Sequence, residues 1–122
     1  MKNKILVVDD NLINIKLISN VLEAAGFEVH KANSAEAAIT ELGVSLPDLI
    51  LMDIELPGMD GLTLTKLLKS KDQTKSIPIV ALTSYAMVGD DKKAYEAGCE
   101  GYITKPIDTR KFPGLITKFL TD

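Results

Sequence analysis

The sequence predicts a three-layer α/β sandwich with a parallel sheet in the middle. Short apolar runs alternate with longer stretches in which apolar residues recur at helical spacing, a pattern typical of repeated strand–helix units. The runs are continuous rather than interrupted at every second residue, which indicates strands that are buried on both faces. The five runs span residues 5–8, 27–30, 49–52, 79–82 and 102–103.

The first two helices are predicted from apolar stripes and from residues that begin or end helices. The first is expected over residues 11–25, and Gly26 can end it. Ser34 has the side chain of an N-cap and predicts the start of the second helix. The side chains expected to face the core are Leu17, Ile18, Val21, Leu22 and Ala25 in the first helix, and Ala35, Ala38, Ile39 and Leu42 in the second.

Three more helices complete the pattern. The third is expected over residues 60–70, where Asp60-Gly61 suits a transition from loop to helix, and the fourth over residues 87–97. The fifth is expected to begin near Asp108, and Pro113 should weaken or bend its first turn because proline has no backbone N–H. Inward side chains are predicted to be Leu64, Leu67 and Leu68 in the third helix, and Phe112, Leu115, Ile116, Phe119 and Leu120 in the fifth.

Composition indicates a single soluble domain spanning residues 1–122 and argues against several classes of function. The apolar fraction of 46% and the charged fraction of 25% are those of an ordinary globular domain. The net charge of −3 gives no field that would attract the chain to nucleic acid, so direct nucleic-acid binding is not expected.

Neither a membrane location nor an oxidising compartment is expected. The longest apolar stretch, residues 49–52, is far too short to span a bilayer, and the apolar run after the first residues is too short for a signal peptide. Cys99 is the only cysteine, which rules out an intrachain disulfide and a cysteine-framed zinc site. We therefore expect a cytoplasmic protein in which Cys99 is a small packing residue.

The candidate chemistry lies where the predicted strands end. Asp9 and Asp10 follow the first strand, Asp53 follows the third, Thr83 the fourth and Lys105 the fifth. In a parallel doubly wound sheet these ends lie along one edge, and ligands bind in the crevice at the topological switch point. Residues far apart in the sequence should therefore converge there.

This set of side chains suits phosphoryl chemistry with a divalent cation. Three carboxylates in one crevice repel one another, so they require either raised pKa values or a counter-cation. Oxygen ligands with room for water suit Mg2+. Lys105 would add a positive charge and Thr83 a hydroxyl donor. A phosphoryl group arriving at Asp53 needs these groups, because phosphoryl transfer depends on positioning and on neutralising the phosphoryl oxygens.

Four segments make the sequence resemble the receiver domains of two-component response regulators along essentially its whole length. They are VVDDN at residues 7–11, LMDIELPGMDG at 51–61, ALT at 81–83 and GYITKP at 101–106. The resemblance is strongest to single-domain regulators of the cell-fate, DivK-like group. It implies a flavodoxin-like, five-stranded parallel sheet in the order 2-1-3-4-5 with five helices on both faces.

The resemblance also assigns roles to the crevice residues. Asp53 would accept the phosphoryl group from a phosphohistidine on a histidine kinase or phosphotransferase. Asp10 and Asp53 would bind Mg2+ through carboxylate oxygens, Asp9 through water and Glu55 through its backbone carbonyl. Lys105 would contact a phosphoryl oxygen. The protein would then be a signalling switch rather than an enzyme, catalysing only its own phosphorylation and dephosphorylation.

A second set of implied roles concerns the switch. Thr83 would swing toward the phosphoryl group and Tyr102 would turn inward behind it, although Tyr102 also suits a half-buried strand position. The signal would leave through the surface of the fourth helix, fifth strand and fifth helix, including Lys92, Lys93, Tyr95 and Tyr102, toward a downstream protein. Glu55 and Tyr85 occupy places that tune loss of the phosphoryl group, and the Lys105-Pro106 peptide is expected to be cis.

Leu12 and Ile15 lie outside the predicted inward stripe of the first helix, beside the acidic crevice. Scattered surface apolarity explains such residues equally simply. Our hypothesis is that both dock a helix of the phosphodonor protein.

Two other functions compete with the switch. A haloacid-dehalogenase-like phosphatase also uses an aspartyl phosphate, but its nucleophile follows the first strand with a second acid two residues later, and Asn11 and Leu12 occupy those positions here. A pseudo-receiver that no longer accepts a phosphoryl group would fit the fold but not the complete set of polar residues. His30, the only histidine, is interpreted as structural.

Overall fold

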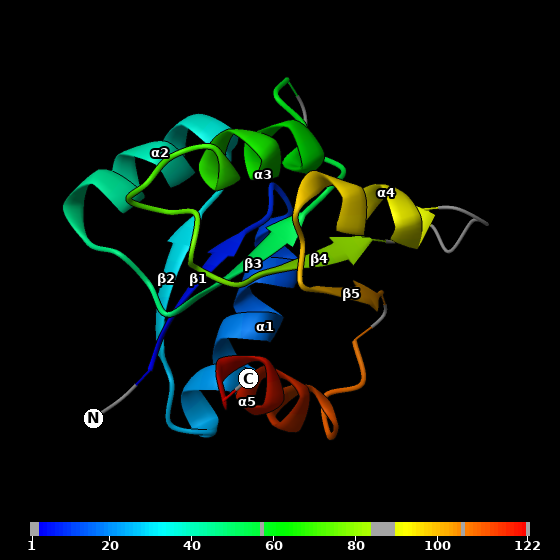
Figure 1. The fold of residues 1–122 in the computed structure, drawn as a ribbon. Helices are drawn as coiled ribbons and strands as arrows, with labels where there is room; N and C mark the ends of the chain where they lie inside the picture. The colour runs from blue at the N-terminus through cyan, green and yellow to red at the C-terminus, as the bar shows by residue number, and fades with distance from the viewer. Residues whose placement is uncertain (1–2, 57, 84–89, 106, 122) are drawn as a thin grey trace.

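A five-stranded parallel sheet forms the middle layer, with strands in the order β2-β1-β3-β4-β5 (Figure 1). The structure is a computed structural model that describes residues 3–56, 58–83, 90–105 and 107–121. The strands are β1 (Lys4–Val8), β2 (Glu28–Ala32), β3 (Leu49–Asp53), β4 (Ile79–Thr83) and β5 (Gly101–Thr104), and the helices are α1 (Leu12–Ala24), α2 (Ala35–Val44), α3 (Gly61–Lys69), α4 (Asp90–Ala97) and α5 (Phe112–Thr121). The predicted fold class and strand order are confirmed.

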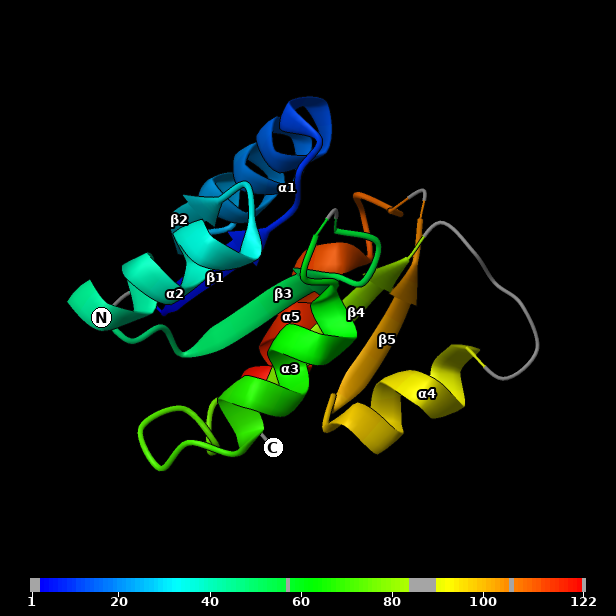
Figure 2. The ribbon, with the colours of Figure 1, turned by 90° about the horizontal axis from the view of Figure 1, so that it is seen from above.

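Helices cover both faces of the sheet. Helices α2, α3 and α4 lie on one face, and α1 and α5 lie on the other (Figures 1 and 2). Alternate residues of each central strand enter the two cores, as in β1, where Leu6 packs with the α2–α3 side and Ile5 with the α1–α5 side. All five residues of β3 and of β4 are buried. The continuous apolar runs of the central strands β1, β3 and β4 therefore mark strands enclosed from both sides, as predicted, whereas the edge strands β2 and β5 are only partly buried.

Side-chain caps determine where three helices begin. The Asn11 side chain accepts hydrogen bonds from the backbone N–H groups of Ile13 and Asn14, Ser34 caps α2 and Asp60 caps α3. Each cap satisfies N–H groups that have no partner within the helix. The predicted start at Ser34 and the predicted transition at Asp60-Gly61 are confirmed.

The predicted inward face of α1 is partly wrong, although Ile18 and Leu22 are buried and Val21 packs against the core, as predicted. Its buried residues are Ile15, Ile18, Ser19 and Leu22, which recur at i, i+3, i+4 and i+7. Leu17, predicted to face the core, is 45% exposed, and Ala25 is also exposed. A polar residue, Ser19, occupies the inward stripe and an apolar one, Leu17, lies outside it, so hydrophobicity alone located the inward face only in part.

Helix α5 begins later than expected. The carboxylate of Asp108 accepts a hydrogen bond from the backbone N–H of Arg110, which forms a turn ahead of the helix. The helix starts at Phe112, so Pro113 lies in its first turn. Backbone N–H groups of a first turn have no partner within the helix, so the N–H that proline lacks costs no intrahelical hydrogen bond. Strand β2 spans Glu28–Ala32 rather than 27–30, and the segment 84–89, expected to include the start of α4, lies outside the described residues.

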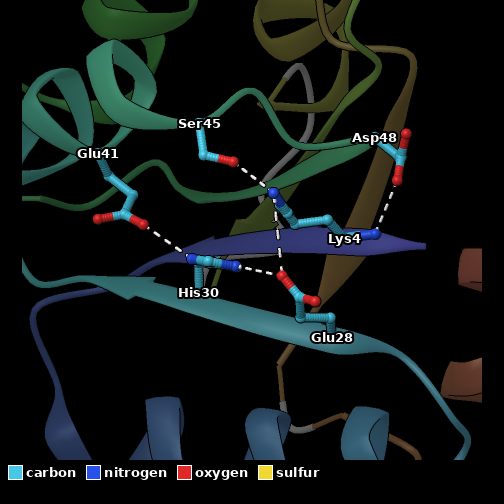
Figure 3. A network of polar contacts seen from close by, with 6 residues as sticks. All are labelled: Lys4, Glu28, His30, Glu41, Ser45 and Asp48. Atoms are coloured by element: carbon cyan, nitrogen blue, oxygen red, sulfur yellow. Dashed lines mark hydrogen bonds and ion pairs between the residues drawn. The ribbon is translucent and has the colours of Figure 1, made fainter. Parts of the chain in front are cut away.

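A polar network joins the edge strand β2 to β1 and α2 (Figure 3). Ring atom Nε2 of His30 lies 2.7 Å from Glu28, and Nδ1 lies 2.8 Å from Glu41 of α2. Lys4 donates to Ser45 through Nζ and to Asp48 through its backbone N–H, and its Nζ lies 3.9 Å from Glu28. Both ring nitrogens of an imidazole can donate only when it is protonated. The hydrogen bonds to Glu28 and then Glu41 accordingly raise the pKa of His30 above its ordinary value of 6.5.

This network predicts a pH-dependent contribution to stability. Because the folded-state pKa of His30 is raised, its contribution is complete below about pH 6.5 and is lost as pH rises through the folded-state value. The melting temperature of the wild type should therefore fall, relative to that of His30→Gln, as pH rises above about 6.5. Thermal melts of both proteins at several pH values from about 6 to 8 measure the difference between their melting temperatures. Other titrating groups affect both proteins equally and so cancel in this difference. A difference that does not change with pH would contradict the prediction.

Candidate functional site

Three strands deliver charged side chains to one point. Asp9 follows β1, Asp53 is the last residue of β3, and Lys105 follows β5. The Nζ atom of Lys105 lies 3.1 Å from Oδ2 of Asp9 and 3.6 Å from Oδ2 of Asp53. Carboxylate oxygens of Asp9, Asp10 and Asp53 all lie within 4.8 Å of one another. The predicted convergence of the three aspartates and the lysine is confirmed.

These side chains line an open crevice of about 170 Å³, together with Glu55, Asn11 and Asn14. The first two aspartates differ in burial, since Asp9 is fully buried and Asp10 is exposed. Asn11 and Asn14 were not predicted to line the site, although Asn11 directly follows the aspartate pair in the sequence. The crevice thus presents oxygen-bearing side chains on several sides and has room for water molecules.

Hydrogen bonds fix the orientation of the two buried carboxylates. The backbone N–H of Asn11 donates to Oδ1 of Asp9 at 2.9 Å, and the backbone N–H of Glu55 donates to Oδ1 of Asp53 at 2.9 Å. The other oxygen of each carboxylate faces Lys105. Each carboxylate is therefore held on one side by the main chain and on the other by the lysine.

Burial dominates the electrostatics of the crevice. The pKa of Asp53 is raised to about 6, chiefly because the carboxylate is removed from water; the Glu55 N–H opposes this shift, the negative charge of Asp9 adds to it, and Lys105 opposes it. Burial lowers the pKa of Lys105, but the charges of Asp53 and Asp9 outweigh it and raise that pKa overall. Lys105 therefore stays protonated, yet a single lysine leaves the crevice with an excess of negative charge.

The two proposed switch residues lie on β4 and β5, on the Lys105 side of the sheet, and neither lines the crevice. Thr83 is fully buried as the last residue of β4, and its carbonyl accepts a hydrogen bond of 2.7 Å from the backbone N–H of Lys105. Tyr102 is half-buried on β5, where it pairs with Ala81 and packs against the core on the α2–α3–α4 side. Two other residues with implied roles, Tyr85 and Pro106, lie outside the described residues.

The structure corrects half of the predicted docking pair. Leu12 is 72% exposed, as expected, but Ile15 is only 6% exposed and belongs to the core under α1. Ile15 is buried because it starts the inward stripe, three residues before Ile18. The exposed apolar neighbour of Leu12 is instead Ile13, at 79% exposure.

Comparison with known protein families agrees with the crevice geometry. The family described as response regulator receiver domain matches residues 5–117 of this chain. The chain belongs to the response regulator receiver family. The receiver domain is a component of two-component signalling, so the protein acts in signal transduction.

Individual relatives resemble this receiver domain over its full length. It is 40% identical to the polar-differentiation response regulator DivK of Brucella anthropi, and the alignment covers 100% of this chain and 99% of the relative. The chemotaxis protein CheY4 of Vibrio cholerae superposes with a TM-score of 0.92 at 25% identity, covering 98% of this chain and 99% of that one. The receiver domain of a sensor histidine kinase from Pseudomonas aeruginosa superposes with a TM-score of 0.90 at 28% identity, covering 100% of both chains.

The crevice residues fit a hard divalent cation. Asp9, Asp10 and Asp53 offer carboxylate oxygens within a span of 4.8 Å, and hard cations such as Mg2+ prefer oxygen ligands and retain some of their water. The excess negative charge gives such a cation a favourable field. In the part of the chain that the structure describes, no helix is long and apolar enough to cross a membrane.

The raised pKa of Asp53 predicts that its ionised form destabilises the metal-free fold. Stability from this group is complete below about pH 3.8 and is lost as pH rises through about 6. At neutral pH, Asp53→Asn should therefore raise the melting temperature of the metal-free protein by several degrees and reduce the further rise caused by Mg2+. Thermal melts with and without Mg2+ test this, with the exposed-site variant Asp72→Asn as control. Equal Mg2+-induced shifts in wild type and Asp53→Asn would contradict it.

Proposed function

We propose that Asp53 accepts a phosphoryl group from a phosphohistidine in a Mg2+-dependent step. The observation that carries the proposal is the placement of Lys105 Nζ 3.6 Å from Asp53 within a cluster of three carboxylates. Mg2+ would be held by carboxylate oxygens of Asp10 and Asp53, by the backbone carbonyl of Glu55 and, through water, by Asp9. When bound, it neutralises phosphoryl oxygens. The Pseudomonas aeruginosa relative, solved with a magnesium ion coordinated in its active-site cleft, supports this choice of cation.

The hydrogen bonds of Asp9 support an indirect role for this residue. One of its oxygens accepts from the backbone N–H of Asn11 and the other lies 3.1 Å from Lys105. Both oxygens of Asp9 thus accept a hydrogen bond, whereas Oδ2 of Asp53 lies 3.6 Å from Lys105, beyond hydrogen-bond distance. Asp9 is therefore better suited than Asp53 to hold a metal-bound water rather than the cation itself. Asp10, which is exposed at the crevice, has more freedom to bind the cation directly.

The reaction follows from the position of Asp53. A carboxylate oxygen of Asp53 attacks the phosphorus in line, an O–P bond forms, and the P–N bond to the donor histidine breaks, returning its electron pair to the imidazole. The positive charge of Lys105 partly neutralises one phosphoryl oxygen. Positioning and charge neutralisation account for most of the catalysis in such transfers.

The output follows from the placement of Thr83. Its hydroxyl would move to bond a phosphoryl oxygen, and Tyr102 would turn inward behind it, changing the surface of α4, β5 and α5. Such a change is an order or packing switch driven by local charge. Exposed side chains of α4, including Lys92, Lys93 and Tyr95, would present the change to a downstream protein.

The acceptor is tested by intact mass after incubation with acetyl phosphate. Wild type should gain the mass of one phosphoryl group with Mg2+ and none without it, and Asp53→Asn should gain none. Lys105→Met should accumulate the adduct more slowly, because a phosphoryl oxygen loses its cationic partner. A wild type that gains no mass and binds no beryllofluoride would favour a pseudo-receiver, and an adduct that persists in Asp53→Asn would assign a different acceptor.

We also propose that the phosphodonor protein docks at the exposed start of α1. Leu12 and Ile13 are the exposed apolar residues there, and Leu12 borders a shallow hollow of about 330 Å³ that Ala32 and Ala37 help to form. An exposed apolar patch beside a reactive crevice suits a helix of a histidine kinase or phosphotransferase, which must bring its phosphohistidine to Asp53.

This docking site predicts a donor-specific defect. The double variant Leu12→Ser, Ile13→Ser should slow transfer from a phosphorylated histidine phosphotransferase while leaving the rate with acetyl phosphate unchanged, because the small donor needs no docking surface. Phosphorylation rates with both donors measure it. Val44→Ser, at a position 81% exposed at the end of α2, is the matched control. Equal slowing with both donors would count against docking at α1.

A further inference from the structure

Helix α3 starts in direct contact with the main chain of Asp53. A Cβ atom placed on Gly61, the first residue of α3, would lie 2.3 Å from the carbonyl oxygen of Asp53 and 2.7 Å from Cα of Ile54. Nonbonded carbon and oxygen atoms do not approach so closely, and these neighbours are backbone atoms that cannot turn aside as a flexible side chain can. Gly61 is therefore required here by space, because any side chain would need about 1 Å more room.

Both partners in this contact are fixed. Asp60 caps α3 by accepting from the backbone N–H of Thr63, and the buried hydroxyl of Thr65 donates to the carbonyl of Gly61 at 2.7 Å. Leu64 and Leu68 anchor the same helix in the core. A methyl group on Gly61 would consequently displace the chain at Asp53 and Ile54, the start of α3, or both.

Displacement at Asp53 would reach the crevice directly. The backbone N–H of Glu55 orients the Asp53 carboxylate, and the backbone N–H of Ile54 donates to the carbonyl of Leu82 at 3.1 Å. Glu55 itself lines the crevice. A shift of Ile54 therefore moves both the acceptor carboxylate and the adjoining backbone that faces the cation.

We propose that Gly61 is a positioning residue for the reaction at Asp53. Because Gly61 has no side chain, the start of α3 can pack directly against the end of β3. This contact holds the Asp53 carboxylate and the Glu55 main chain in the geometry that binds Mg2+ and receives the phosphoryl group. The inference rests on the proposed function, to which it adds a residue outside the crevice lining.

The matched experiment compares two glycines of the helices. Gly43 lies in α2, and a Cβ atom placed on it would meet no neighbouring atom within 4 Å, so Gly43→Ala adds the same methyl group without a clash. Mg2+ affinity by titration calorimetry and the acetyl phosphate reaction rate at saturating Mg2+ are measured for both variants. We expect Gly61→Ala to bind Mg2+ about tenfold to a hundredfold more weakly and to react more slowly even when saturated, with Gly43→Ala like the wild type.

A stability control separates positioning from folding. Asp60→Ala removes the cap of α3, which lowers the melting temperature, but adds no atom near Asp53. It should keep Mg2+ affinity at 25 °C close to that of the wild type. If Mg2+ affinity falls in Asp60→Ala as much as in Gly61→Ala, or falls in neither, the positioning role is wrong.

Two further outcomes are distinguishable. If Gly61→Ala does not fold, Thr65→Val is measured in its place, because it removes the hydroxyl that donates to the Gly61 carbonyl. Thr65→Val should bind Mg2+ several-fold more weakly than the wild type. Unchanged Mg2+ binding in that variant would overturn the positioning role of Gly61. A wild type that neither binds Mg2+ nor gains a phosphoryl group would instead overturn the proposed function, and the role of Gly61 with it.

Discussion

Every functional feature of the molecule depends on burying Asp9 and Asp53 beside a single lysine. The two carboxylates are 0% and 2% exposed, and Lys105 lies within ion-pair distance of both. The lysine compensates part of the charge and joins the ends of β1, β3 and β5. The ionised Asp53 carboxylate destabilises the metal-free fold, chiefly because it is buried and in part because Asp9 repels it, as the raised pKa of Asp53 indicates, and the same negative charge attracts a cation. The same buried negative charge therefore both lowers the stability of the metal-free protein and allows it to bind a cation.

The sheet order explains why this arrangement arises from residues so far apart. Strands β1 and β3 are neighbours in the centre of the sheet, and the connections that leave them run to opposite faces, which opens a crevice at their carboxyl ends. Lys105 reaches that crevice from β5 across the end of β4, where its backbone N–H bonds to the carbonyl of Thr83. Movement of the main chain at Thr83 would therefore displace Lys105 as well as change the contact with the phosphoryl group.

The sequence predicted the site better than it predicted helix faces. Strands β1, β3, β4 and β5 end close to the point where an apolar run meets a polar residue, so Asp53, Thr83 and Lys105 could be placed from the sequence. The face of α1 could be placed only in part from hydrophobicity, because Ser19 lies inward and Leu17 outward. The helical spacing of Ile15, Ile18 and Leu22, at i, i+3 and i+7, matches the buried face that the structure shows. The contact of Gly61 with Asp53 has no sequence signal of its own, since it depends on the path that returns the chain from β3 to α3.

A switch of this kind requires one part of the site to stay fixed while another moves. Asp53 is held through its main chain by α3 at Gly61 and by Leu82, and through its side chain by Glu55 and Lys105. Thr83 and Tyr102 belong to the strands on the other side, β4 and the edge strand β5. An edge strand has a partner on only one side, so rearrangement there disturbs fewer hydrogen bonds than rearrangement at β3 would. The proposed acceptor therefore lies in the constrained centre of the sheet, and the residues proposed to respond lie toward its edge.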